Sequence, residues 1–236
     1  MPTHILNIET TTTQCSVALA TDGQLVGVEQ SNHQDYQHSK LLHTYIHQLL
    51  QSHSLTPSDL SAVAVSSGPG SYTGLRIGVG AAKGLCFGCD IPLIALPTLV
   101  ILAQEIQKES GYILPVLDAR RDEVYVAVYD TKHNLVQAAT PHVLSQDSFT
   151  QWANQGSVFF VGTGIKKCKR ILAPHQNLYF PNKESFPSAT HMVALSYQKY
   201  QQGDFEDLAY FDPEYLKSFQ VTPSKKDALG LPKTNR

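Results

Sequence analysis

The stretch from Ala64 to Gly88 reads AVSSGPGSYTGLRIGVGAAKGLCFG, and residues of these types could cradle a phosphate. Gly68-Pro69-Gly70 supplies a tight turn, and Ser71 is placed to cap the helix that is predicted to follow. The N-terminus of a helix after such a turn can bind an anion. The stretch lacks the lysine of a Walker phosphate loop and the acidic partner of a dinucleotide-binding motif. These residues alone therefore favour a plain turn between a strand and a helix.

The predicted helix contains four glycines: Gly74, Gly78, Gly80 and Gly84. Each costs roughly 0.8–1 kcal/mol relative to alanine in an exposed helix interior, and the total is a large fraction of a domain's stability. Gly74 and Gly78 share a face with Ala81, and a face without side chains lets another backbone approach closely. That backbone belongs either to a partner protein or to another element of this chain, and the pattern does not decide between them.

Two carboxylates, Glu9 and Asp118, end the first apolar run of each half of the chain. Carboxylates in a cleft can hold Mg²⁺ against phosphates, but a carboxylate that caps nearby backbone N–H groups fits equally well. Arg120 and Arg121 follow in a loop of mixed charge. They could bind phosphate or pair with the acids of their own loop.

Two further motifs are disfavoured as chemical sites. His43 and His47 have a spacing that can grip a metal, but Thr44 replaces the glutamate of the H-E-x-x-H motif. Cys86 and Cys89 form a C-x-x-C at the end of a predicted helix, whereas a redox motif places its first thiol at a helix start. We expect solvent-facing histidines and structural cysteines.

The bulk composition is that of an ordinary soluble chain. The 236 residues are 42% hydrophobic and 16% charged, and the formal net charge of −2 gives no basic excess for tight nucleic-acid binding. Neither a run of about 18 apolar residues nor an N-terminal leader pattern is present, so we expect no membrane span and no secretion. The cysteines, at positions 15, 86, 89 and 168, are expected to be reduced thiols of a cytoplasmic protein.

The order of the predicted elements repeats along the chain. In the first half, strands are predicted at 4–9, 15–20, 25–29, 61–66 and 91–96, and helices at 36–52, 72–87 and 98–108. In the second half, strands are predicted at 112–117, 123–129, 135–139, 158–161 and near 178, and helices at 146–153, 165–172 and 189–200. This order predicts an α/β fold with a duplicated βββαβαβα unit and two lobes around a cleft. The expected domains are 1–109 and 110–202, followed by an extended tail at 203–236.

Several segments resemble the TsaB family, also called YeaZ, and follow one another in the same order. They are ILNIETTTTQCSVAL, SSGPGSYTGLRIGVGAAKGL, IPLIALPTL, PVLDARRDEVYVAVY, VGTG and PEYLKSF, and they span nearly the whole chain. The resemblance implies an ASKHA (actin-like, RNase H-like) fold, in agreement with the repeat. It also implies a cytoplasmic, non-catalytic subunit that binds and activates TsaD, the enzyme that forms threonylcarbamoyladenosine at position 37 of tRNA (t6A). TsaE, an ATPase, is a further implied partner, and tRNA is met indirectly through the complex.

The resemblance also implies lost catalytic features. TsaD proteins carry a metal-binding H-x-x-x-H just after the strand that follows the glycine-rich helix, and Thr98 and Leu102 stand at these positions here. We therefore expect no metal and no cofactor. The phosphate loops of ASKHA ATPases carry glycine after the acid, which this chain lacks in both halves. A vestigial nucleotide or phosphate site is expected at Glu9, Asp118, Gly162 and Gly164.

The partner surface is also implied by the resemblance. In the family, the contact between TsaB and TsaD resembles a helix bundle made by the first two helices of each N-terminal lobe, and the same surface supports homodimers. The corresponding interface candidates are His38, Leu41, Leu42, Tyr45, Gly74, Gly78 and Ala81. We expect the Gly78→Leu variant to fold and to lose its partner. Unfolding would mean that Gly78 faces an element of its own chain.

Two other activities are considered for this fold class. An ASKHA-type small-molecule kinase would bind ATP at Glu9 and Asp118, and titration of the isolated chain with Mg-ATP tests this alternative. A metalloprotease, an older interpretation of this superfamily, would need the metal ligands that Thr98 and Leu102 replace.

Overall fold

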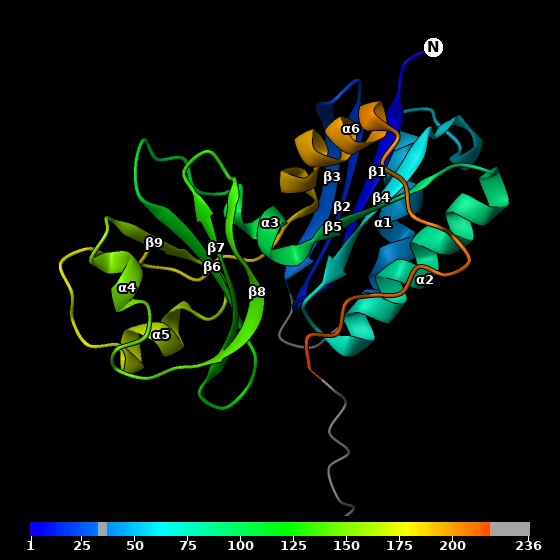
Figure 1. The fold of residues 1–236 in the computed structure, drawn as a ribbon. Helices are drawn as coiled ribbons and strands as arrows, with labels where there is room; N and C mark the ends of the chain where they lie inside the picture. The colour runs from blue at the N-terminus through cyan, green and yellow to red at the C-terminus, as the bar shows by residue number, and fades with distance from the viewer. Residues whose placement is uncertain (33–36, 218–236) are drawn as a thin grey trace, which may run out of the picture.

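The computed structural model describes residues 1–32 and 37–217 as two lobes, each built on a five-stranded mixed sheet (Figure 1). The first sheet has the order β3-β2-β1-β4-β5 and consists of β1 (His4–Glu9), β2 (Gln14–Thr21), β3 (Gln24–Asn32), β4 (Ala62–Gly68) and β5 (Leu93–Pro97). The second has the order β10-β9-β6-β7-β8 and consists of β6 (Tyr112–Asp118), β7 (Glu123–Asp130), β8 (Leu135–Val143), β9 (Val158–Val161) and β10 (Leu178–Tyr179). In both sheets the first strand pairs antiparallel with the second and parallel with the fourth. The predicted duplication is confirmed.

Helices cover both faces of the first sheet. Over both lobes, the described helices are α1 (His38–Ser52), η1 (Pro57–Asp59), α2 (Tyr72–Cys89), α3 (Thr98–Ala103), α4 (Thr150–Ala153), α5 (Ile165–Ile171), η2 (Ala189–Met192) and α6 (Val193–Gln202). α1 and α2 pack on the face that Leu6 and Ile8 supply, whereas η2 and α6 pack on the face of Ile5. Because successive strand residues point to opposite faces, β1 contributes to both cores. Among the described residues, no helix is long and apolar enough to span a membrane.

α3 lies between the two lobes (Figure 1). Its Ile101 is buried in the core of the first sheet. Leu99 and Leu102 instead pack in a second core with Ile113 and Val161 from the second sheet. The lobes are therefore joined around α3 by a core of apolar side chains, and the burial of these side chains from water stabilises the junction.

The final helices belong to the first lobe, whereas the order of the predicted elements places residues 189–202 in a second domain at 110–202. Met192 and Val193 are buried against the first sheet. The backbone N–H of Ala189 also donates to Ser16 Oγ in β2 at 3.1 Å. Hydrophobic periodicity predicts a helix here, but it does not specify which of two similar sheets the helix covers.

Some element boundaries also differ from those predicted. α1 begins at His38, and Tyr36, the predicted start, lies outside the described residues. α3 ends at Ala103 rather than at 108, and the carbonyl of Ala103 is hydrogen-bonded to the ring of His133 at 3.1 Å. β8 is longer than predicted and continues to Val143.

Residues 204–217, which we call the strap, follow α6 and cross the first lobe (orange in Figure 1). The N–H of Glu206 donates to the carbonyl of Leu93 at 2.9 Å, and the N–H of Glu214 donates to the carbonyl of Ser67 at 2.7 Å. At its end, Lys217 Nζ donates to the carbonyl of Ala119 in the second lobe at 3.1 Å. The strap therefore links the two lobes. The rest of the predicted tail, 218–236, lies outside the described residues.

Candidate functional site

The backbone groups of the turn before α2 contact other residues of the same chain, so they are not arranged around a space for a phosphate. Ser71 Oγ accepts from the N–H of Gly74 at 3.3 Å, as the predicted cap requires. The N–H of Ser71 donates to the carbonyl of Thr11 at 2.7 Å. Gly68 has a φ of 113°, and a Cβ at this position would lie closer than 3.0 Å to the carbonyl oxygen of Glu214. The close approach of the chain's own backbone accounts for this glycine, as a plain turn requires.

Gly74 and Gly78 face Thr10, which follows β1. A Cβ on Gly74 would collide with the carbonyl oxygen of Thr10, and a Cβ on Gly78 would collide with its Oγ1. Thr10 Oγ1 also donates to the carbonyl of Gly74 at 2.8 Å. The backbone that approaches this glycine face therefore belongs to the same chain. For Gly78→Leu we now expect loss of folding, not loss of partner binding alone.

Most other interface candidates also have internal roles. His38 is buried, with Nε2 hydrogen-bonded to the carbonyl of Thr12 at 2.8 Å. Leu42 and Ala81 are buried in the core between α1, α2 and the sheet. Leu41 and Tyr45 are half-buried at the edge of that core, and Tyr45 donates from its hydroxyl to Ser31 Oγ at 2.7 Å. This face of α1 and α2 is thus largely used in folding the lobe.

A different face of α2 is open. Gly80, Gly84 and Gly88 are spaced by four residues and lie on one side of the helix, and a Cβ on any of them would meet nothing within 4 Å. Phe87 next to them has 83% of its surface exposed. We call these four residues the open face of α2. The spacing of 80, 84 and 88 could have revealed this face in the sequence, but it does not show which glycine stripe the chain covers.

Glu9 is fully buried at the end of β1. Its Oε1 accepts from the N–H of Thr11 at 2.6 Å and from Thr11 Oγ1 at 2.5 Å. Its Oε2 has no hydrogen-bond partner among the described residues. Burial raises the pKa of this carboxyl to about 7, although the hydrogen bonds from Thr11 oppose the shift. Of the two readings of Glu9 in the sequence, the local cap fits these contacts.

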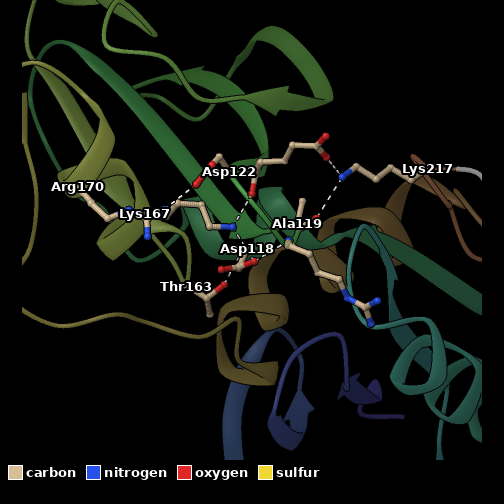
Figure 2. A network of polar contacts seen from close by, with 9 residues as sticks. Asp118, Ala119, Asp122, Thr163, Lys167, Arg170 and Lys217 are labelled. Carbon is tan, nitrogen blue, oxygen red and sulfur yellow. Dashed lines mark hydrogen bonds and ion pairs between the residues drawn. The ribbon is translucent and has the colours of Figure 1, made fainter. Parts of the chain in front are cut away.

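Asp118 lies in the other sheet and is exposed (Figure 2). Its Oδ1 accepts from the N–H of Arg120 at 2.7 Å and from Lys167 Nζ at 2.9 Å. Its N–H donates to Thr163 Oγ1 at 3.1 Å. The carboxylate of Asp118 is therefore ion-paired with Lys167 and hydrogen-bonded to the backbone of its own turn.

A hollow of about 320 Å³ lies beside this carboxylate. Its lining residues are Asp118, Thr163, Lys166, Lys167, Arg170 and Glu184. Glu9 does not line it, and the two predicted glycines serve packing instead: Gly162 approaches the carbonyl of Val116, and Gly164 approaches the side chain of Val124. The structure does not bring the four residues of the predicted vestigial site together around this hollow.

The positions linked with metal chemistry are part of the interior. Thr98 and Leu102 in α3 are both buried. In residues 1–32 and 37–217, no group of three or more histidine, cysteine or acidic side chains is arranged to hold a metal ion. His43 and His47 are exposed on α1, and Cys86 is a buried thiol whose pKa is raised to about 11 by burial.

Two lobes of equal strand order, each with an acid at the end of its first strand, define an ASKHA-type protein. The family model described as "TsaD: tRNA N6-adenosine threonylcarbamoyltransferase" matches residues 30–225. The Escherichia coli K12 protein named "tRNA threonylcarbamoyladenosine biosynthesis protein TsaB" is 30% identical over 221 residues, which are 91% of this chain and 95% of that one. The structure of YeaZ from Pseudomonas aeruginosa superposes with a TM-score of 0.73 at 26% identity, over 91% of this chain and all of the other. This chain belongs to the TsaB family.

A third relative extends this comparison. The Bacillus subtilis protein of the same name is 37% identical over 137 residues, which are 58% of this chain and 59% of that protein.

Proposed function

We propose that this chain is a non-catalytic subunit of the complex that makes threonylcarbamoyladenosine in tRNA, and that it binds and activates a TsaD transferase. The relatives are named for the biosynthesis of this nucleoside, and the matching family model is that of the transferase. The observation that carries the proposed role is the open face of α2.

The glycines of the open face of α2 make the helix less stable than alanines would, and no contact within the described chain compensates for this loss. Glycine in an exposed helix interior is about 0.8–1 kcal/mol less favourable than alanine. At Gly74 and Gly78 the close contact with Thr10 explains the glycines, but at Gly80 and Gly84 nothing in the described structure does. A helix from another chain that packs here at close range would explain both, and Phe87 would lose its exposed apolar surface in the same contact.

The contacts of the residues first considered for catalysis support a non-catalytic role. Asp118 is bound by Lys167, and Glu9 is held by Thr11 within the interior. Thr98 and Leu102 stand where the resemblance to TsaD places metal ligands; both are buried, and Leu102 packs in the core that joins the lobes. These contacts favour a subunit role over the kinase and metalloprotease alternatives.

The same proposal covers the other partners. A second copy of this chain fits the open face of α2 as a TsaD helix does, so homodimer and heterodimer would compete for it. TsaE joins the assembly through TsaD or at the boundary of the pair. The complex acts on tRNA in the cytoplasm.

Reconstitution of the reaction tests the function. TsaD, TsaE, unmodified tRNA and threonylcarbamoyl-adenylate are combined with and without this chain, and the modified nucleoside is measured by mass spectrometry. We expect formation only when the chain is present. Equal formation without it would refute the proposal, and turnover by the chain alone would show that it is catalytic.

A further inference from the structure

The turn between β6 and β7 has an uncommon backbone. Arg120 and Arg121 are adjacent, with φ values of 68° and 48°, in the left-handed region that residues other than glycine rarely adopt. The N–H of Ala119 donates to the carbonyl of Glu123, and the N–H of Glu123 donates to the carbonyl of Arg120, both at 3.1 Å. Asp118 Oδ1 accepts from the N–H of Arg120 and helps to hold the turn. Asparagine or glycine tolerates the left-handed region far better than arginine.

The two arginines are the unpaired charges of this turn. Both are exposed, and no acidic side chain in the described part of the chain forms an ion pair with either. Each acid of the turn is paired with another cation: Asp118 with Lys167 and Asp122 with Arg170, as Figure 2 shows, and Glu123 with Lys217. The alternative that the arginines simply neutralise their own loop is therefore wrong.

Two exposed aromatic rings pack together where the strap passes the start of α2. The rings of Tyr72, at the start of α2, and Tyr215, in the strap, have centroids 5.0 Å apart, and each residue is 43% exposed. Arg76 donates to the hydroxyl of Tyr72 at 2.7 Å. Lys217, two residues beyond Tyr215, reaches the carbonyl of Ala119 in the turn, so the strap joins the rings to the arginines.

Lys217 also lies between the turn and a third ring. Its Nζ donates to the carbonyl of Ala119, the residue before Arg120, and burial and the charge of Arg121 lower its pKa, whereas the charge of Asp118 opposes the shift. Lys217 Nζ lies 5.6 Å from the ring centroid of Tyr125. The strap thus brings the cations of the turn and the exposed rings at the start of α2 to the same region, and we call this set of residues the arginine–tyrosine surface: Tyr72, Arg76, Arg120, Arg121, Tyr215 and Lys217.

We propose that the arginine–tyrosine surface contacts the tRNA substrate directly, with the arginines on backbone phosphates and the exposed tyrosine rings against an unpaired base. Arginines recognise phosphate through several N–H donors, and bases of single-stranded RNA stack on aromatic rings. This inference rests on the proposed function, because that function supplies the RNA. The formal charge of −2 means that the surface adds to binding by the partner enzyme and is not a tight site alone.

A double variant tests the phosphate contacts. Arg120→Asn with Arg121→Asn removes both charges and keeps residues that tolerate the left-handed turn. Binding of labelled tRNA is measured by fluorescence polarisation between 50 and 200 mM salt, with the full chain alone and mixed with TsaD. We expect at least tenfold weaker binding and a salt dependence of log K that is less steep by about 1.4 to 1.8, as two lost phosphate contacts predict.

Two matched variants separate this contact from general effects. Lys40→Ala with Lys132→Ala removes two exposed charges elsewhere and should change binding little. Tyr215→Leu should weaken binding without changing the salt dependence. Urea unfolding confirms that each variant is folded.

Three results would overturn the inference: an arginine variant that binds like the wild type, a lysine variant that loses as much affinity, or competition by polyglutamate as strong as that by RNA. If the chain stimulates modification but the arginine variant still binds tRNA normally, only this inference fails. If the chain does not stimulate modification at all, the proposed function fails instead.

Discussion

Replacing Gly74 by leucine is expected to destabilise the chain by about 3 kcal/mol or more, enough to unfold a marginally stable domain. The new Cβ would meet the carbonyl oxygen of Thr10 at a distance that real structures do not show. That oxygen is backbone at the end of β1, and Thr10 is buried, so it cannot move aside without disturbing the sheet. Urea unfolding followed by circular dichroism measures the loss.

Gly84→Leu is the matched control on the same helix. Nothing lies within 4 Å of a Cβ at this position, and leucine has the better helix propensity. We expect a free energy of unfolding equal to that of the wild type or higher by up to about 1 kcal/mol. Copurification with TsaD should be lost, because the leucine side chain would keep a partner helix from approaching closely.

The pair of variants assigns the two glycine stripes. If Gly84→Leu still copurifies with TsaD and Gly74→Leu folds normally, then neither the internal role of Gly74 nor the partner contact at the open face of α2 is correct. If Gly84→Leu binds TsaD like the wild type and Gly74→Leu unfolds, the internal role stands and the open face of α2 is not the interface. The two variants can be compared directly because both replace glycine by leucine in the same helix, so they differ only in the face that the leucine occupies.

The sequence predicts those features that depend on local pattern. The apolar run at 4–9 predicts the buried strand β1, and the turn residues Asp22-Gly23 predict the hairpin that joins β2 to β3. The predicted Ser71 cap is also present. Such signals lie within a few residues of the elements that they define.

The missed features depend on contacts between distant parts of the chain. The partner of Gly74 is Thr10, 64 residues away, and no spacing within α2 indicates which of its glycine stripes meets that residue. η2 covers the first sheet through Ala189 and Ser16, which are 173 residues apart. The exposure of an acid at the end of a strand likewise depends on what covers that end, so Glu9 and Asp118 look equivalent in the sequence and differ in the structure.

Glu9→Gln is expected to change how stability depends on pH. In the folded chain burial raises the pKa of Glu9 from an ordinary value of 4.5 to about 7, so folding favours the uncharged form. The contribution is complete below pH 4.5, declines as the pH rises towards 7 and is constant above that. The difference between these two pKa values corresponds to about 3 kcal/mol in total, most of which is lost between pH 5 and pH 8.5.

Glutamine reproduces the protonated carboxyl. Its Oε1 can still accept from the N–H and Oγ1 of Thr11, and its amide N–H₂ stands where the carboxyl proton would be. Urea unfolding of both proteins at several pH values should give similar stabilities near pH 5, and the variant should be more stable by about 2 to 3 kcal/mol at pH 8.5.

The difference between the two proteins is the informative quantity. His38 and His191, whose pKa values are lowered by burial, weaken the fold as the pH falls, and they do so equally in both proteins. Glu109→Gln makes the same chemical change at an exposed position and should leave the profile unaltered. Parallel profiles for the wild type and Glu9→Gln would mean that Glu9 is already ionised in the fold, and a cation or an ordered water molecule must then stabilise its Oε2.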